Sequence, residues 1–82
     1  MEKPWFVYIL ECKDDSFYTG VTNDLDKRMK THASGKGSKY VRIKGFKCLL
    51  KSKECESKSD AHKAEYKIKQ LAKWDKLDWF KD

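Results

Sequence analysis

Two short apolar runs near the start of the chain dominate its hydrophobic pattern. The first spans residues 5–10 and the second residues 17–21, and both are rich in β-branched and aromatic side chains. Between them lies the polar segment 13–16, which contains turn-forming residues. This pattern predicts two strands, over about 6–12 and 17–22, that are joined by a tight turn. An isolated hairpin is marginally stable at best, so we expect the rest of the chain to cover it.

Each predicted strand carries one tyrosine, Tyr8 in the first and Tyr18 in the second. Side chains alternate between the two faces of a strand, so the length of the turn decides whether these phenols share a face. A turn of three or five residues, or a β-bulge, places them on the same face, whereas a regular four-residue loop does not. Gly20 lies inside the second strand, where a glycine usually marks a bend or a close approach to the backbone.

Residues 23–35 have the pattern of an amphipathic helix. Asn23 is a suitable N-cap, and acidic residues follow in the first turn, where the helix dipole favours them. Gly35 suits the position just beyond the helix. Arg28 and His32 are four residues apart and are therefore expected on the same side. The side chains expected to face the core are Leu25, Met29, His32 and Ala33.

Residues 34–45 lack a clear period and are predicted to form a long loop. The segment contains three glycines, and its cations are interleaved with Tyr40. Loops of this length in compact domains are usually functional or mobile. The cations of the segment are Lys36, Lys39, Arg42 and Lys44. A third strand is expected to follow over about 46–54.

A second helix is expected from its N-cap Ser57 to about Lys73. Its apolar stripe consists of Ala61, Ala64, Ile68 and Leu71. Glu65 lies within that stripe, and a buried unpaired carboxylate costs several kcal/mol, so Glu65 must find a cation or hydrogen-bond donors. A short closing helix is expected over 74–80, with Asp75 as its cap and with Leu77 and Phe80 packed inward.

Together these elements predict an α/β (α+β) fold. It comprises a small three-stranded, mainly antiparallel sheet flanked by helices, in the order β-β-α-β-α-α. The 82 residues suffice for one domain, over 1–82, with no room for a second core. The chain shows no apolar run near twenty residues and no secretory leader, so we expect a cytoplasmic protein without a membrane span. Its three cysteines lack CxxC spacing, which favours reduced thiols over disulfides or a zinc site.

The charge balance indicates the kind of partner. Nineteen Lys and Arg residues against thirteen Asp and Glu residues give a formal net charge of +6. An excess of this size favours a polyanionic partner, although the charge alone suits DNA, RNA or a membrane surface equally well.

The order of these residues resembles the GIY-YIG nuclease superfamily, and most of all its small stand-alone bacterial members. The paired signature of that family corresponds to Val7-Tyr8-Ile9 and Tyr18-Thr19-Gly20. The likeness extends from about residue 5 to residue 77. It includes Arg28 and His32 on the first helix, Lys39-Tyr40-Val41-Arg42 in the loop, and Glu65 on the second helix.

The resemblance implies an endonuclease that depends on one Mg²⁺ or Mn²⁺ ion and hydrolyses phosphodiester bonds in DNA, in DNA repair or processing. Tyr8 would activate water, which requires a nearby cation because a free phenol has a pKa of ~10. Arg28 would bind the scissile phosphate. His32 would share proton transfer or hydrogen-bond a phenol, and Tyr18 would orient the phosphate or the nucleophile. Glu65 would hold the metal ion together with water and phosphate oxygens.

The remaining candidate residues would bind the substrate. Gly20 would let the substrate approach the backbone, and the basic loop would contact phosphates through Lys36, Lys39, Tyr40 and Arg42. With no separate recognition domain, we expect mainly electrostatic binding to DNA and low sequence specificity. A protein partner would then supply specificity, and we expect a monomer or weak dimer.

Two other readings of the sequence stay open. Individually, the tyrosines are also explained as core-rim residues, Arg28 as a solvated helix residue and His32 as a structural histidine. Many active GIY-YIG nucleases carry an Asn beyond the Glu, whereas the only Asn here is Asn23. This departure favours a non-catalytic nucleic-acid-binding module with the same fold. The other alternative is a protein-interaction domain that uses the apolar segment 74–80.

Overall fold

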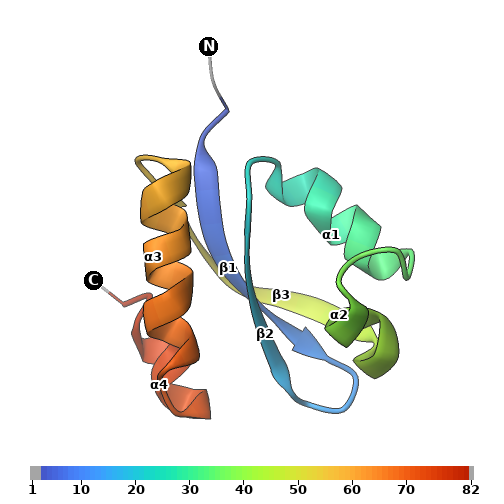
Figure 1. Cartoon of the computed structure of the whole chain (residues 1–82). Helices are drawn as coiled ribbons and strands as arrows, with labels where there is room; N and C mark the ends of the chain where they lie inside the picture. Colours follow the sequence, from blue (N-terminus) through green and yellow to red (C-terminus); the bar gives the residue numbers. More distant parts are fainter. Residues whose placement is uncertain (1–2, 82) are drawn as a thin grey trace.

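A computed structural model describes residues 3–81. A three-stranded antiparallel sheet lies between two groups of helices (Figure 1). β1 (Trp5–Cys12) is the central strand, and β2 (Phe17–Thr22) and β3 (Phe46–Cys55) are its two edges. The predicted strands agree with these bounds to within one residue at each end. The centre of β1 is fully buried on both faces, as its continuous apolar run predicts.

The turn between β1 and β2 is a three-residue loop, residues 13–15. The backbone N–H of Cys12 donates to the carbonyl of Ser16 at 2.8 Å and closes the loop. Asp15, the last loop residue, has a φ of 69°. A left-handed residue at this position is typical of three-residue hairpin loops. The turn is therefore of one of the lengths that place the two tyrosines on the same face.

The register of the hairpin confirms this placement. Tyr8 lies opposite Gly20, and Leu10 lies opposite Tyr18. Because Tyr8 and Leu10 are two residues apart on β1, Tyr8 and Tyr18 point to the same face of the sheet. Their ring centroids are 6.5 Å apart.

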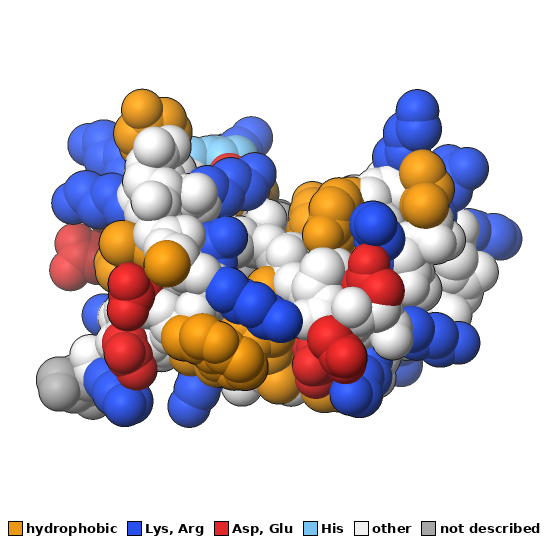
Figure 2. Space-filling model, turned by 90° about the horizontal axis from the view of Figure 1, so that it is seen from below, with side chains coloured by type: hydrophobic (Ala, Val, Ile, Leu, Met, Phe, Trp, Pro, Cys, Tyr) orange, Lys and Arg blue, Asp and Glu red, His pale blue; other side chains and the backbone are white. Residues whose placement is uncertain are grey.

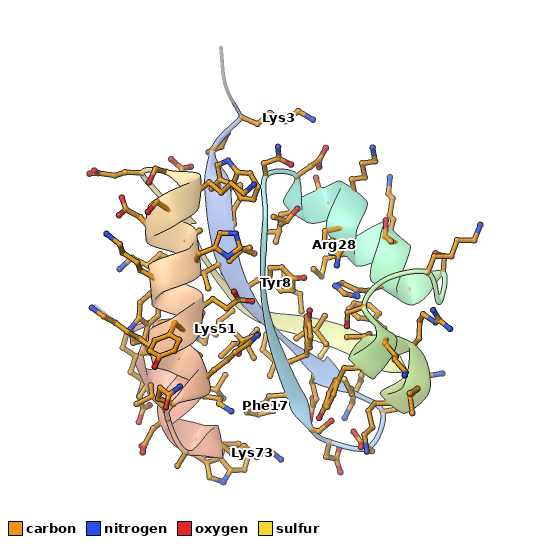
Figure 3. The ribbon with its side chains drawn as sticks, viewed as in Figure 1. Lys3, Tyr8, Phe17, Arg28, Lys51 and Lys73 are labelled. Carbon is orange, nitrogen blue, oxygen red and sulfur yellow. The ribbon has the colours of Figure 1, made fainter. Side chains whose placement is uncertain are left out.

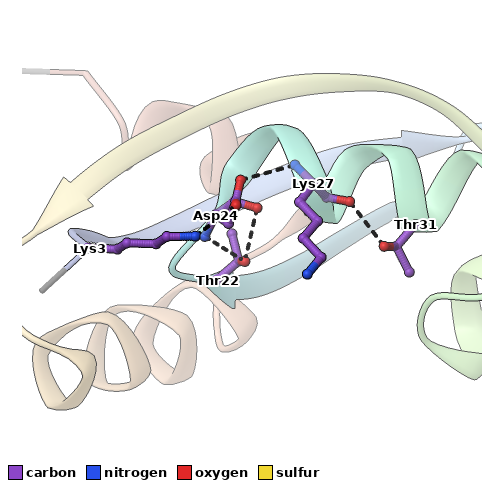
Figure 4. A network of polar contacts seen from close by, with 5 residues as sticks. All are labelled: Lys3, Thr22, Asp24, Lys27 and Thr31. Carbon is purple, nitrogen blue, oxygen red and sulfur yellow. Dashed lines mark hydrogen bonds and ion pairs between the residues drawn. The ribbon is translucent and has the colours of Figure 1, made fainter.

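The first helix, α1 (Leu25–Ala33), begins one residue later than expected. Asp24, not Asn23, is the N-cap, since its side chain accepts a hydrogen bond from the backbone N–H of Lys27 at 3.2 Å (Figure 4). The Thr22 hydroxyl accepts from the N–H of Asp24, and Lys3 pairs with the carboxylate of Asp24. These contacts from both sides of Asp24 explain why it, and not its neighbour, caps the helix.

Two other expectations for α1 have different outcomes. Gly35 has a φ of 79°, as expected of a residue that ends a helix in the left-handed conformation. Ala33 is exposed, so the prediction that it faces the core is wrong. The buried residue of α1 is His32, which lies under the last turn of the helix.

The predicted loop over residues 34–45 is partly wrong, because it contains a short helix, α2 (Lys39–Lys44). The Ser38 side chain caps this helix by accepting from the N–H of Val41, and Gly45 ends it with a φ of 85°. Val41 is its only buried residue. A helix of six residues with one buried position has too short a pattern to be recognised in the sequence.

The C-terminal helices also differ from the prediction in their bounds. α3 (Lys58–Lys69) has the expected cap, Ser57, but ends four residues early, and α4 (Lys73–Asp78) follows after a short turn. The N-cap of α4 is Ala72, so Asp75 lies in the first turn instead of capping it. Leu77 and Phe80 pack against the core, as predicted.

The core consists of two layers, one on each face of the sheet. The layer beneath α3 is formed by Val7, Ile9, Ala64 and Ile68. The layer beneath α1 and α2 is formed by Tyr8, Leu10, Cys12 and Val41. Within residues 3–81, no helix has the length and apolar character needed to cross a bilayer.

Candidate active site

The free edge of β2 forms the floor of a surface groove. Figure 2 shows this side of the molecule hollowed between two raised lobes, with lysine side chains on both. Figure 1 places α3 and α4 on one side of β2, and α1 and α2 on the other. Within the groove lies a cavity of about 250 Å³. It is lined by Phe17, Tyr18 and Thr19 of β2, Tyr40 of α2, Lys69 of α3 and Lys76 of α4.

Tyr8 and His32 form a buried hydrogen-bonded pair beside this groove. The Tyr8 hydroxyl lies 2.9 Å from Nε2 of His32, and the two residues are only 1% and 2% exposed. Tyr8 comes from the central strand and His32 from the last turn of α1. Figure 3 shows Tyr8 in the space between the sheet and α1, together with Arg28. The structure thus brings together two residues that are 24 positions apart in the sequence.

The imidazole of His32 is enclosed on its remaining sides. The ring of Phe46 stacks on it at 6.4 Å between centroids, and the ring of Tyr18 meets it edge-on at 5.8 Å. Burial and the neighbouring Arg28 charge lower the pKa of His32 to about 4. His32 is therefore neutral at pH 7, and its Nε2 is able to accept a hydrogen bond from the Tyr8 hydroxyl.

Gly37 packs directly against the other nitrogen of this ring. A Cβ atom at residue 37 would lie 2.3 Å from Nδ1 of His32, so only glycine fits there. Nδ1 is buried and has no hydrogen-bond partner among the described residues. This contact has no direct signal in the sequence, because glycines in the segment 34–45 are equally explained by a flexible loop.

Gly20 plays a similar spatial role for Tyr8. A Cβ atom at residue 20 would lie 2.5 Å from the hydroxyl oxygen of Tyr8 and 2.7 Å from Cζ. The close approach to the backbone that the sequence predicts at Gly20 is therefore made by Tyr8 itself. A contact between Gly20 and a substrate stays a prediction.

The pKa of Tyr8 reflects opposing effects. Burial raises the pKa of the Tyr8 hydroxyl above its ordinary value of 10.0, and the Arg28 guanidinium acts in the opposite direction. The charges of Tyr18 and Glu65 add smaller effects that raise the pKa. The expected cation is thus present beside Tyr8, but burial outweighs it. Tyr8 is a neutral phenol in the resting protein.

Arg28 has an unsatisfied donor at this site. Its Nε is buried and forms no hydrogen bond with any described residue. A cavity of about 220 Å³ lies beside Arg28, and Thr22, Lys27 and Thr31 are among the residues that line it. Buried polar groups in proteins are rarely left without a partner. Arg28 also borders this cavity, and a guanidinium next to a cavity is suited to an anionic ligand.

Tyr18 connects the buried pair with the surface. Its ring is half-buried against His32 and stacks on the ring of Tyr40 at 5.9 Å between centroids. Tyr40 is 40% exposed and borders the groove cavity. A continuous set of aromatic rings therefore runs from His32 to the open groove.

Glu65 lies in the layer opposite to Tyr8. Its helix, α3, packs on the face of the sheet that carries Val7 and Ile9, whereas Tyr8 belongs to the other face. The carboxylate is close enough for its charge to raise the pKa of Tyr8. Glu65 is 20% exposed and pairs with His62 and Lys69 of its own helix, each at 3.3 Å.

The described residues offer few groups that could bind a metal ion. Within residues 3–81, no cluster of three or more His, Cys, Asp or Glu side chains is arranged to hold a metal ion. Mg²⁺ is often bound by one or two carboxylates, with water and substrate phosphates as its other ligands. The single, partly buried carboxylate of Glu65 has the donor chemistry for a site of that kind.

The other predicted substrate-binding residues lie apart from the buried pair. Lys36, Lys39 and Arg42 are exposed, and their side chains form no hydrogen bond or ion pair with the described part of the chain. Two lysines that sequence reasoning missed, Lys69 and Lys76, line the groove instead. The i,i+4 spacing of Glu65 and Lys69 was the available signal for one of them.

Comparison with known proteins identifies the family. The model of the GIY-YIG catalytic domain matches residues 4–78. The chain belongs to the GIY-YIG family. Family members with nuclease activity generally depend on a divalent metal.

The chain is also similar to individual relatives and to solved structures. The UPF0213 protein OB0043 of Oceanobacillus iheyensis is 47% identical over 77 residues, which cover 94% of this chain and 90% of the relative. The solution NMR structure of the UPF0213 protein BH0048 from Bacillus halodurans is 48% identical, with a TM-score of 0.56 and coverage of 93% of this chain and 81% of that one. The NMR structure of EF2693 from E. faecalis is 36% identical, with a TM-score of 0.67 and coverage of 99% and 88%.

Proposed function

We propose that this GIY-YIG protein is a divalent-metal-dependent endonuclease that hydrolyses phosphodiester bonds in DNA along the groove at the edge of β2. The observation that carries the proposal is the buried Tyr8–His32 hydrogen bond of 2.9 Å beside Arg28, whose Nε lacks a partner among the described residues. Hydrolysis of a phosphodiester needs an activated water and positive charge at the phosphate. Tyr8 and His32 are suited to activate the water, and Arg28 is suited to supply the positive charge.

The Tyr8 hydroxyl and His32 form a route for a proton. A neutral imidazole accepts the hydrogen bond from the phenol, so the Tyr8 oxygen presents a lone pair to a water molecule. As that water attacks the phosphorus, Tyr8 takes its proton and passes its own to Nε2 of His32, while the P–O bond to one sugar oxygen breaks and that oxygen leaves with the bonding electrons and takes a proton from solvent. This relay avoids a free phenolate, which burial of Tyr8 disfavours.

Arg28 couples this relay to the substrate. Its guanidinium borders a cavity of about 220 Å³ and would bind an oxygen of the scissile phosphate there. The Arg28 charge lowers the pKa of His32. A bound phosphate would offset that charge, so the imidazole would become a better proton acceptor when the substrate is in place.

Glu65 would hold the divalent ion, Mg²⁺ or Mn²⁺, from the α3 side of the groove. Such an ion, when bound, adds positive charge at the phosphate and lowers the pKa of coordinated water. Tyr18 would orient the phosphate, supported by its stacking on Tyr40. Lys36, Lys39 and Arg42 would contact neighbouring phosphates at the rim.

The biological setting that we propose is DNA repair or processing in the cytoplasm. The groove offers lysines, which suit phosphate contacts, and such contacts carry no sequence information. Sequence specificity should therefore be low, and a protein partner would supply it.

Nicking of supercoiled plasmid tests the proposed function. The wild-type protein is expected to nick the plasmid with Mg²⁺ or Mn²⁺ and not with EDTA, and the Tyr8→Phe and Glu65→Gln variants are expected to lose this activity. Lys63→Met, a substitution on the outer face of α3, serves as the control and should retain it. If the purified protein shifts the mobility of DNA but never cuts it with any divalent ion, the chain is a binding module and the proposed reaction is wrong.

A further inference from the structure

The carboxylate of Glu65 already has a cationic partner in this structure. Its Oε2 lies 3.3 Å from Nζ of Lys69, one helical turn away, and its Oε1 lies 3.3 Å from Nδ1 of His62. The side chain of Glu65 is 20% exposed, whereas that of Lys69 is 52% exposed. The carboxylate is thus held by packing, while the lysine has room to change its conformation.

Lys69 also faces the substrate groove. Together with Tyr18, Thr19 and Tyr40, it lines the cavity of about 250 Å³ at the free edge of β2. Its ammonium group therefore lies between two possible anionic partners. One is the Glu65 carboxylate of the same helix, and the other is a phosphate of a strand in the groove.

A divalent cation and the Lys69 ammonium cannot both be close partners of one carboxylate without strong repulsion. At a separation of about 5 Å, their mutual repulsion exceeds that of two single charges by a factor of about two. The exposed ion pair between Glu65 and Lys69 is weak, like other i,i+4 pairs on helices. A bound divalent ion would therefore displace Lys69 from Glu65.

From these contacts we infer that Lys69 exchanges partners. In the metal-free protein it neutralises Glu65, and when a divalent cation takes the carboxylate, Lys69 turns to a phosphate of the DNA in the groove. This inference rests on the proposed metal-binding role of Glu65. It adds Lys69 as a substrate-binding residue. It also couples the binding of the divalent cation to the binding of DNA, because each of them would favour the conformation in which Lys69 is turned away from Glu65.

Titration calorimetry with Mn²⁺ in the absence of DNA tests the first half of the exchange. Lys69→Met removes the competing cation, so it should bind Mn²⁺ about three to ten times more tightly than the wild-type protein. Lys63→Met removes the same charge from the outer face of α3 and should bind Mn²⁺ with the wild-type affinity. Glu65→Gln should lose binding in the same titration.

The salt dependence of DNA binding tests the second half. It is measured in a Tyr8→Phe background, with Mn²⁺ or with EDTA, on one duplex oligonucleotide. Loss of a phosphate contact lowers the slope of log K against log salt by about one unit. With Mn²⁺, the slope for Lys69→Met should be lower than the wild-type slope by about this amount. With EDTA, the difference in slope should be less than about half as large, because Lys69 of the wild-type protein is then paired with Glu65 and not with a phosphate. Lys63→Met should show no difference between the two conditions.

The outcomes separate this inference from the proposed function. If Glu65→Gln binds Mn²⁺ as well as the wild type does, both the metal role of Glu65 and the exchange are wrong. If Glu65→Gln loses binding while Lys69→Met matches the wild type in Mn²⁺ affinity and salt slope, the exchange is wrong and the metal site stands. Tighter Mn²⁺ binding together with a metal-dependent change of slope in Lys69→Met supports the exchange.

Discussion

His32 is the most tightly enclosed polar residue of the site. The Tyr8 hydroxyl, the ring of Phe46 and the backbone of Gly37 surround its imidazole, and the Arg28 charge lies nearby. An exposed histidine gains a proton near pH 6.5, but the imidazolium form of His32 would lose its hydration without gaining an anionic partner. His32 is therefore kept neutral by its surroundings.

The stability of the protein should consequently depend on pH. The unfolded chain binds a proton at His32 below about pH 6.5, whereas the folded protein does so only near pH 4. Stability from this group is thus fully present above pH 6.5 and is lost as the pH falls toward 4. Urea unfolding should show a loss of about 2 kcal/mol between pH 7 and pH 5. His32→Gln lacks the titrating group, and a variant that shows the same loss would contradict this account.

Gly37 offers a second test at the residue scale. The Cβ atom in Gly37→Ala would displace the imidazole of His32, break its hydrogen bond with Tyr8 and lower the cleavage rate by about 10- to 100-fold. Gly35→Ala is the matched control, because nothing lies within 4 Å of its added Cβ and only its φ of 79° is unfavourable. It should cost about 1 kcal/mol of stability and leave the rate unchanged. Equal cleavage rates for the two variants would rule out a positioning role for Gly37.

At the scale of elements, the turn between β1 and β2 sets the geometry of the site. Its three residues fix the register that places Tyr8 and Tyr18 on one face. The turn depends on Asp15, the only non-glycine residue with a positive φ within residues 3–81. A substitution in this loop therefore alters the positions of Tyr8 and Tyr18 through the strand register, although no loop residue belongs to the site.

Substitution of Asp15 tests this dependence. Asp15→Gly fits the left-handed conformation and should keep the stability within about 0.5 kcal/mol of the wild type. Asp15→Val places a β-branched residue at a φ of 69° and should lose about 1–2 kcal/mol. Both variants lose the same exposed contact with Lys47, so the difference between them in urea unfolding isolates the backbone effect. Equal stabilities would show that the turn is not restrained in this way.

The sequence predicted the elements with long, regular patterns and missed those that depend on tertiary contacts. The three strands and the caps at Ser57 and Gly35 follow from local rules. The common face of the tyrosines required the structure, because the sequence pattern left the length of the turn open. Helix α2 was not predicted, because a helix with a single buried residue shows no repeating spacing of apolar residues in the sequence. The N-cap of α1 is Asp24 and not the predicted Asn23, because Thr22 of the preceding strand and Lys3 near the N-terminus bind Asp24.

For the candidate site, the sequence indicated which residues carry chemistry but not their arrangement. The pairing of Tyr8 with His32 and the stacking of Tyr18 on Tyr40 required the fold. Burial raises the pKa of Tyr8 by more than the charge of Arg28 lowers it, and this balance also depends on the packed structure. The groove-lining role of Lys69 and Lys76 was hidden because both belong to a lysine-rich region that looks uniformly solvated.

On the scale of the whole molecule, the groove joins the two layers that the sheet separates. β2 is an edge strand, with α1 and α2 on one side and α3 and α4 on the other (Figure 1), and side chains of α2, α3 and α4 line the cavity beside it. At one end of β2, Lys73 lies over the ring of Phe17 at 4.8 Å from its centroid (Figure 3). The free edge of β2 thereby brings basic and aromatic groups of separate layers to one surface.

The net charge of +6 predicts how the whole molecule binds DNA. If about three phosphates are contacted in the groove, the affinity should fall about 10- to 100-fold when monovalent salt rises from about 50 to 200 mM. Fluorescence anisotropy with a labelled duplex measures this dependence. An affinity that does not change with salt would point instead to a protein-interaction domain that uses the apolar C-terminal end.

The central claim is that Tyr8 belongs to the reaction centre, and single-turnover cleavage of an end-labelled DNA with Mn²⁺ tests it most directly. Tyr8→Phe removes one oxygen atom and should lower the cleavage rate by at least about 100-fold while DNA affinity stays within about twofold of the wild type. Tyr66→Phe, a substitution at a tyrosine that is 69% exposed, should cleave at the wild-type rate. Cleavage by Tyr8→Phe at the wild-type rate would contradict the account.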